Sequence, residues 1–177
     1  MEGELLWRAH SLGSETTEAV GENLGRVLVP GALVGLIGDL GSGKTTLVRG
    51  LARGLEVLGP IQSPTFTRMR SLPGRLALHH FDAWRGGGDA LFEEGTEFLA
   101  GSGVAVVEWA DRVEPHLPRP RIEIRLLHRG PERRELGARL LPAVPHSGAA
   151  TAELERRLRT ALELAGATLG LELLPRA

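Results

Sequence analysis

The stretch Gly38–Thr45 has the residue types and spacing that most plainly predict chemistry, because it fits the pattern G-x-x-x-x-G-K-[ST] at every fixed position. Lys44 in this stretch is the only lysine among the 21 lysine and arginine residues of the chain. A lysine side chain carries a compact ammonium on a slim stem, whereas arginine carries a planar fork. Glycine amides and one ammonium together reach the β- and γ-phosphate oxygens of a nucleotide. The sequence therefore predicts a nucleotide-binding loop of the phosphate-loop class.

The segments on either side of this loop agree with that interpretation. Leu33–Ile37 is a short, almost wholly apolar run, which is typical of a buried parallel strand. Thr46–Leu55 follows with Leu47, Leu51 and Leu55 at helical spacing. A strand, a glycine-rich loop and a helix in this order are the context that the motif requires.

Two carboxylates follow other predicted strands. Asp82 comes after the extended segment Leu76–Phe81, and Glu108 comes after the apolar run Val104–Val107. In open parallel sheets, ligands bind beyond the carboxyl ends of the strands. Magnesium takes oxygen ligands, so we expect Thr45, Asp82 and Glu108 at a Mg²⁺ ion. Glu108 has a second possible role, which is to polarise the attacking water.

The candidate catalytic residues are Lys44, Asp82 and Glu108. The candidate nucleotide-binding residues are the loop, the residue after it and two positions beyond: Gly38, Asp39, Leu40, Gly41, Ser42, Gly43, Lys44, Thr45, Thr46, Thr65 and Trp109.

Thr65 belongs to Ser63–Thr67, just past the loop helix. Many hydrolases place a mobile segment there that senses the γ-phosphate, although a proline-kinked edge strand is an almost equal alternative. His79 and His80 are adjacent, so in a strand they face opposite sides and favour packing or hydrogen bonding over a shared metal.

For the aromatic and basic residues near the predicted site, the simpler interpretations are preferred. Core packing is favoured over base stacking for Trp84 and Trp109. Solvated turn positions are favoured over nucleotide, partner or tRNA contacts for Arg133 and Arg134.

The remaining elements complete a phosphate-loop α/β fold with three layers, a mainly parallel sheet and an added antiparallel hairpin. The first of them are a strand at Leu5–Ala9 and a helix that starts with Ser14 as its N-cap and carries Ala19, Val20, Leu24, Val27 and Leu28 on one apolar stripe. The others are extended segments at Ile61–Arg70 and Leu76–Phe81, a short helix at Ala90–Leu99, a hairpin of Arg121–Leu127 with Glu135–Leu141, and a helix at Thr151–Ala165. Residues 1–141 are expected to form one phosphate-loop, nucleotide-binding domain. Residues 142–177 are expected to form a linker and a helix packed on it.

Composition excludes several classes. The 177 residues carry a net charge of −1 and include no cysteine, which argues against a surface that coats nucleic acid and removes disulfides and thiolate metal sites. The chain has no apolar run long enough for a membrane span, and its acidic N-terminus is unlike a secretory signal. We expect a cytoplasmic protein with no membrane contact.

Four motifs in order resemble the TsaE (YjeE) family: Gly38–Thr46, Ser63–Thr67, His80–Asp82 and Val107–Trp109. This family is the ATPase component of bacterial tRNA threonylcarbamoyladenosine (t6A) biosynthesis. The resemblance runs from about Leu5 to Leu141 and is much more specific than the loop alone.

The resemblance implies that ATP is the substrate and that the protein works with TsaD and TsaB. These partners install threonylcarbamoyl on adenosine 37 of tRNAs that read codons beginning with A. Hydrolysis by the isolated protein is expected to be weak and to be activated in the complex. Contact with tRNA is expected to be indirect, through that complex. Carried onto this chain, Lys44 and the loop amides bind phosphates, Thr45 and Glu108 hold magnesium, and Asp82 and Trp109 support hydrolysis.

Two features depart from the family pattern. Trp84 stands where the family usually has tyrosine, and the stretch from Pro142 onward is longer than the usual ending. Two rival functions stay open. One is a small-molecule kinase, which shares the loop and fold, and the other is a binding module that uses nucleotide without hydrolysing it.

Overall fold

The computed structural model describes residues 3–64, 69–84 and 101–168 of the chain. Within these ranges, seven strands form one mixed sheet. The strands are β1 Glu4–Ser11, β2 Leu33–Ile37, β3 Met69–Leu72, β4 Leu78–Asp82, β5 Val104–Glu108, β6 Arg121–His128 and β7 Arg134–Leu141. The helices are α1 Ser14–Val27, α2 Lys44–Gly54 and α4 Ala149–Thr168, with 3₁₀ turns η1 Ala110–Arg112 and η2 Glu114–His116.

The order of strands across the sheet is β1-β7-β6-β2-β5-β4-β3. Strands β6, β2, β5 and β4 are parallel, while β1–β7–β6 and β3–β4 pair antiparallel. The predicted α/β class, with a mainly parallel sheet and an antiparallel hairpin of β6 and β7, is therefore confirmed.

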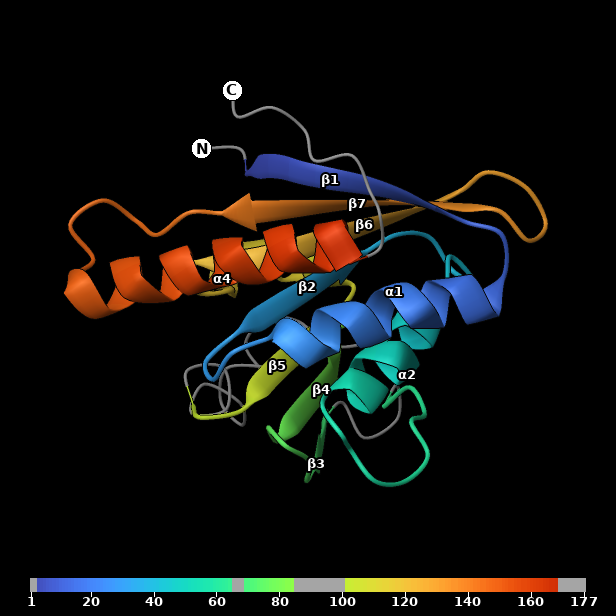
Figure 1. The fold of residues 1–177 in the computed structure, drawn as a ribbon, viewed down its shortest axis with the longest axis horizontal. Coiled ribbons are helices and arrows are strands. Elements are labelled where there is room, and N and C mark those ends of the chain that lie inside the picture. The colour runs from blue at the N-terminus through green and yellow to red at the C-terminus, as the bar shows by residue number, and fades with distance from the viewer. Residues whose placement is uncertain (1–2, 65–68, 85–100, 169–177) are drawn as a thin grey trace.

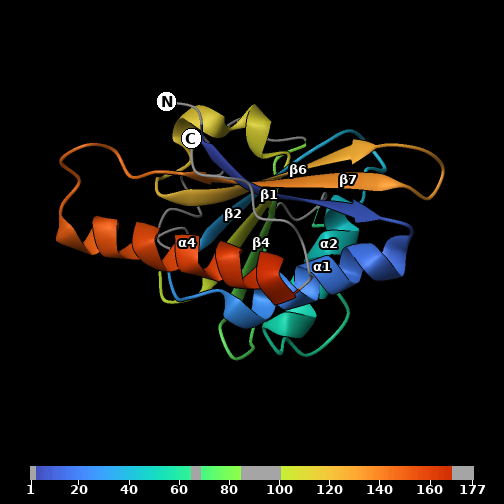
Figure 2. The ribbon, with the colours of Figure 1, turned by 45° about the horizontal axis from the view of Figure 1, so that its top comes forward.

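Apolar side chains bury both faces of the central strands. Every residue of β2 and β5 is buried, as expected for short apolar runs in a parallel sheet. Helices α1, α2 and α4 lie on one face of the sheet (Figure 1; Figure 2). On the opposite face, Ala110, Val113 and Leu117 of the 3₁₀ segment pack on Phe81 and Val107.

Glycines set the distance between α1 and α2. Gly21 and Gly25 of α1 face Gly50 and Gly54 of α2, and a Cβ at any of the four would overlap backbone atoms of the other helix. The two backbones are therefore in direct contact. This contact holds the helix that begins at Lys44 against α1.

The same contact corrects part of the predicted α1 stripe. Val20 and Leu24 are buried as predicted, but Ala19 is exposed because the face turned to α2 carries Gly21 and Gly25 instead. The predicted cap is also wrong, since Gly13 is the N-cap residue and Ser14 is the first residue of the helix.

Helix α4 confirms the helix predicted at Thr151–Ala165 and extends beyond it at both ends. Leu158, Leu162 and Ala165 are buried in the main core. The indole nitrogen of Trp7 donates to the carbonyl of Leu162 at 3.0 Å, so α4 is also tied to β1.

Two other predicted segments are covered only in part. Within Ile61–Arg70, residues 61–64 lack regular structure, residues 65–68 lie outside the described ranges, and β3 begins at Met69. The helix predicted at Ala90–Leu99 also lies outside the described residues. Among the helices that the structure does describe, none is both long and apolar enough to cross a membrane.

A methyl group at Gly50 tests the helix contact. In an exposed helix, Gly→Ala stabilises by about 1 kcal/mol. At Gly50 the new Cβ would overlap the carbonyl oxygen of Glu18, so we expect Gly50→Ala to lower the free energy of unfolding by about 2–4 kcal/mol. Urea unfolding followed by circular dichroism measures this.

Gly137→Ala in β7 is the matched control, because its Cβ would lie 3.5 Å from Leu5 Cδ1, an ordinary contact distance. We expect the control to unfold within about 1 kcal/mol of the wild type. Equal stability of the two variants would contradict the close backbone contact.

Candidate functional site

The buried ammonium of Lys44 lies inside the loop that follows β2. Its Nζ donates to the carbonyl oxygens of Gly38 at 2.6 Å and Asp39 at 2.9 Å. Only 4% of the residue is exposed. Gly41 and Gly43 have φ angles of 74° and 103°, the left-handed region that glycine enters without strain. The loop therefore curls around its own lysine, and α2 starts at that residue.

Glu108 ends β5 beside this loop, as the sequence predicts. Strand β5 is the parallel neighbour of β2, with Leu36 paired to Glu108. The hydroxyl of Thr45 donates to both carboxylate oxygens of Glu108, at 2.9 and 3.0 Å. His80 Nε2 lies 2.9 Å from Glu108 Oε1 and must donate, since a carboxylate only accepts.

The arrangement explains the two adjacent histidines. His80 is buried against Glu108, whereas His79 Nδ1 lies 2.9 Å from Ser71 Oγ on the neighbouring strand β3. The prediction of packing or hydrogen bonding for both histidines is confirmed.

Asp82 lies one strand further from the loop. It is paired in register with Glu108 across β4 and β5 and is 5% exposed. Ser63 Oγ donates to its Oδ2 at 2.7 Å, and the backbone amide of Trp84 donates to its Oδ1 at 2.8 Å. The segment after α2 therefore meets this carboxylate through Ser63, while Thr65 lies outside the described residues.

Two tryptophans form one wall of the site. The Lys44 ammonium lies 3.5 Å from the ring centroid of Trp109, and the rings of Trp109 and Trp84 are 4.4 Å apart between centroids. Arg112 covers this tilted pair, with its guanidinium carbon 4.0 Å from the Trp84 centroid. Trp109 holds this position with a left-handed backbone, at φ 61°.

The sequence-based preference for core packing is thus wrong for Trp84, which is half-buried and faces the site. It is correct only in part for Trp109, which packs against the second core cluster and also lines the cavity beside Lys44. A cation over an aromatic ring is attracted by the ring's negative face, which helps to hold the ammonium in place.

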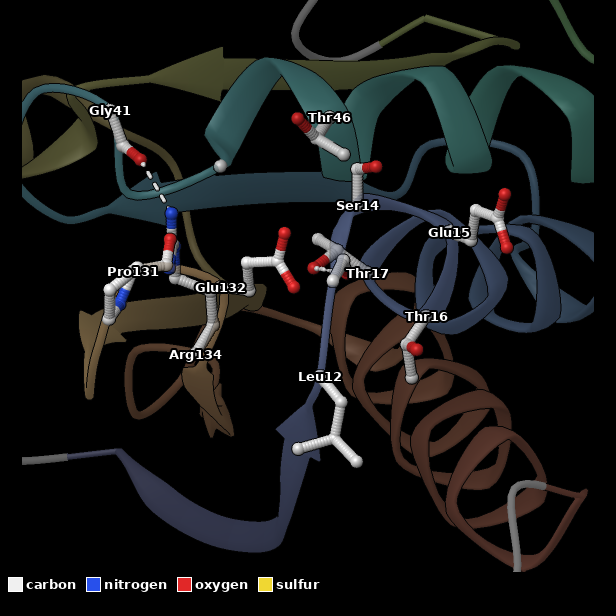
Figure 3. A pocket seen from close by; sticks show the side chains of 12 residues that line it. Leu12, Ser14, Glu15, Thr16, Thr17, Gly41, Thr46, Pro131, Glu132 and Arg134 are labelled. Carbon is white, nitrogen blue, oxygen red and sulfur yellow. Dashed lines mark hydrogen bonds between the residues drawn. The ribbon is translucent and has the colours of Figure 1, made fainter.

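Cavities lie on two sides of the loop. The first, about 380 Å³, contains both carboxylates and both tryptophans of the site, and its lining is Leu40, Gly41, Gly43, Lys44, Thr45, Thr46, Ser63, Asp82, Trp84, Glu108 and Trp109. The second, about 420 Å³, lies between the loop, the start of α1 and the β6–β7 turn (Figure 3). Ser14, Thr16 and Thr46 place hydroxyl groups along its lining.

Arg134 is a site residue that sequence reasoning missed. It was predicted to be a solvated turn arginine, but its Nε donates to the Ser42 carbonyl at 3.1 Å and its Nη2 to the Gly41 carbonyl at 3.4 Å. Figure 3 shows the guanidinium directed at Gly41 from the β6–β7 side. No local pattern marks this contact, since 92 residues separate Arg134 from Ser42.

The oxygen groups fit a magnesium ion. The hydroxyl of Thr45 and the carboxylate of Glu108 are in direct contact, and Asp82 is the neighbouring carboxylate. Within the described ranges, no group of three or more His, Asp or Glu side chains could hold a metal ion. Magnesium does not need one, because it typically takes one or two protein carboxylates together with phosphates and waters.

The loop also has an unused polar group. Ser42 Oγ is the only buried side-chain nitrogen or oxygen in the described part of the chain that lacks a hydrogen-bond partner. Buried polar groups are normally paired, so this hydroxyl is a further sign that the loop is shaped for a ligand.

Burial lowers the pKa of Lys44 below that of an ordinary lysine, because desolvation disfavours the charged form. The carboxylates of Glu108, Asp111 and Asp82 oppose this shift by attracting the ammonium.

Comparison with known proteins points to one family. The family profile described as "Threonylcarbamoyl adenosine biosynthesis protein TsaE" matches residues 12–136. The tRNA threonylcarbamoyladenosine biosynthesis protein TsaE of Bacillus subtilis is 36% identical over 134 residues, covering 75% of this chain and 84% of that protein. The protein of the same name from Treponema pallidum is 40% identical over 121 residues, covering 67% and 90%.

A solved structure agrees. The crystal structure of Bacillus subtilis YdiB superposes with a TM-score of 0.70 at 29% sequence identity, and the match covers 90% of this chain and 98% of that one. The profile match includes the loop, both carboxylates and Arg134, and ends before α4.

The single lysine allows a direct test of the lowered pKa. Only the neutral amine reacts with acetic anhydride, so the labelling rate of Lys44 as a function of pH reports its pKa. We expect the midpoint in the folded protein to lie below the midpoint of the same residue in urea-unfolded chain. Peptide mass spectrometry separates Lys44 from the N-terminal amine. Coincident midpoints would contradict the desolvation of the ammonium.

Proposed function

We propose, since this chain belongs to the TsaE family, that it is an ATP-binding and ATP-hydrolysing subunit of tRNA threonylcarbamoyladenosine biosynthesis. One observation carries the enzymatic part of the proposal. Thr45, the last residue of the loop motif, donates its hydroxyl to the buried carboxylate of Glu108, directly beside the ammonium of Lys44. The ammonium that would bind phosphates and the oxygen atoms that would bind magnesium therefore line the same cavity.

Each residue has a separate role in this proposal. The ammonium of Lys44 and the loop amides bind the β- and γ-phosphates. Thr45 and Glu108 would hold a magnesium ion, which when bound neutralises charge on the phosphate oxygens. To bind phosphate, Lys44 exchanges its bonds to the carbonyls of Gly38 and Asp39 for bonds to the nucleotide.

His80 and Asp82 complete the proposed hydrolytic site. The hydrogen bond from His80 fixes the orientation of Glu108 in the buried strand end. Asp82 is the second carboxylate of the cavity and is oriented by Ser63 and the Trp84 amide. We assign it the orientation of the attacking water, a role that a carboxylate acceptor fills in phosphoryl transfer.

The second cavity suits the nucleoside. It adjoins the loop on the side of Gly41, Gly43 and Thr46 and is lined by hydroxyl groups that can form hydrogen bonds with ribose or base atoms. We therefore place the adenosine of ATP between the start of α1 and the β6–β7 turn.

The biological part of the proposal comes from the family. We propose that the chain acts with TsaD and TsaB in the modification of adenosine 37 in tRNAs that read codons beginning with A. Hydrolysis by the isolated chain is expected to be weak, and the complex is expected to activate it and to supply the contact with tRNA.

Removal of the ammonium tests nucleotide binding. We expect Lys44→Met to weaken ATP affinity at least about 100-fold, because two charge-assisted hydrogen bonds of about 1.5–3 kcal/mol each are lost. Isothermal titration calorimetry with Mg²⁺–ATP measures the change. Arg49→Met, an exposed cation on the same helix, is the control and should bind like the wild type. Equal affinity of Lys44→Met and the wild type would exclude the proposed role of the loop.

Neutralising Glu108 tests hydrolysis separately. We expect Glu108→Gln to lower kcat about 100-fold or more in the presence of TsaB and TsaD, while ATP binding falls much less. Phosphate release is measured against Glu153→Gln, which changes an exposed carboxylate on α4. Unchanged turnover would remove Glu108 from the chemistry.

A further inference from the structure

We propose that Arg134 is a positioning residue for the phosphate loop, which its guanidinium holds by two carbonyl groups in the conformation that receives a polyphosphate. This inference rests on the proposed function, because it assumes that the loop binds ATP. Figure 3 shows the contact from the side of the second cavity.

The backbone of Arg134 is fixed from both sides. Arg134 is the first residue of β7, where it pairs with His128 of β6 and Ser11 of β1 in register. A residue held between two strands presents its side chain from a rigid base. The position of the guanidinium relative to the loop is therefore set by the sheet.

The guanidinium is anchored at its own turn as well. Its Nη1 donates to the carbonyl oxygens of Arg133 at 2.9 Å and Gly130 at 3.1 Å. The Nε and Nη2 groups remain for the loop and donate to Ser42 and Gly41. One planar fork thus joins the β6–β7 turn to the phosphate loop, which a lysine could not do.

Peptide geometry converts this contact into a constraint on the loop amides. In a trans peptide the C=O and N–H groups point in opposite directions. Because Arg134 draws the Ser42 carbonyl to itself, the amide of Gly43 in the same peptide unit points away from Arg134. The Gly41 carbonyl fixes the amide of Ser42 in the same way, and that amide closes the loop by donating to Asp39 at 3.1 Å.

The contact also reduces the conformational entropy that the loop loses when a nucleotide binds. A loop rich in glycine has many accessible conformations, and ordering it on ligand binding consumes free energy. A loop that is already held by two carbonyls needs less ordering. Arg134 therefore raises phosphate affinity without touching the phosphates.

A ligand without a nucleoside separates this role from direct contact between Arg134 and the nucleoside. Arg134 also lines the second cavity, so a loss of ATP affinity alone would not distinguish the two. We expect Arg134→Gln to weaken binding of both Mg²⁺–ATP and Mg²⁺–tripolyphosphate, by the same factor of about 5–20. Isothermal titration calorimetry at one salt concentration measures both ligands.

The matched control is Arg129→Gln, because Arg129 lies before the same turn, is exposed, and bonds to Glu135 instead of the loop. It should bind both ligands like the wild type. Arg134→Lys retains the charge but presents a single point donor, and we expect it to lose most of the affinity that Arg134→Gln loses. A melting temperature within a few degrees of the wild type shows that a variant is folded. If Arg134→Gln does not fold, Arg134→Lys provides the test.

The outcomes are distinct. A loss confined to ATP would show that Arg134 contacts the nucleoside, and wild-type binding by Arg134→Lys would show that charge alone suffices; either result overturns the inference. Unchanged binding of both ligands to Arg134→Gln overturns it as well, while the proposed function stands. If the wild type binds neither ligand, the proposed function fails and the inference fails with it.

Discussion

The parallel pairing of β2 with β5 is the constraint on which the site depends. It places Leu36 opposite Glu108, so the loop that leaves β2 and the carboxylate that ends β5 emerge side by side at the same edge of the sheet. The hydroxyl of Thr45 then reaches Glu108 at hydrogen-bond distance. Parallel strands are buried on both faces, and this burial keeps the carboxylate almost wholly out of water.

Such burial has an energetic consequence for the cation. Removing an ammonium from water is costly, and the structure offsets the cost with two loop carbonyls, the face of Trp109 and nearby carboxylates. The bonds that satisfy Lys44 are internal to the loop. An anionic phosphate oxygen is a stronger acceptor for an ammonium than these neutral carbonyls.

The supports of the loop come from distant parts of the chain. Glycine contacts press α2 against α1, which fixes the helix that begins at Lys44. From the other side, Arg134 fixes the loop carbonyls to the β6–β7 turn. The loop therefore lies between the α1–α2 pair and the β6–β7 turn, and the two cavities lie on either side of it.

The sequence by itself determined the features that depend on local patterns: the loop and its lysine, the apolar strands with a carboxylate at their ends, the hairpin and the terminal helix. Local patterns are enough for these features because hydrophobic periodicity and glycine positions determine the conformation of residues that are close in sequence. Local patterns left the carboxylate that contacts Thr45 open between Asp82 and Glu108, and the tertiary structure shows that it is Glu108. Asp82 comes first along the chain, yet β5 inserts between β2 and β4 and places Glu108 next to the loop. The Trp84–Trp109 wall, the His80–Glu108 bond and the Arg134 contact likewise join residues far apart in sequence, and side-chain packing in the assembled sheet determines them.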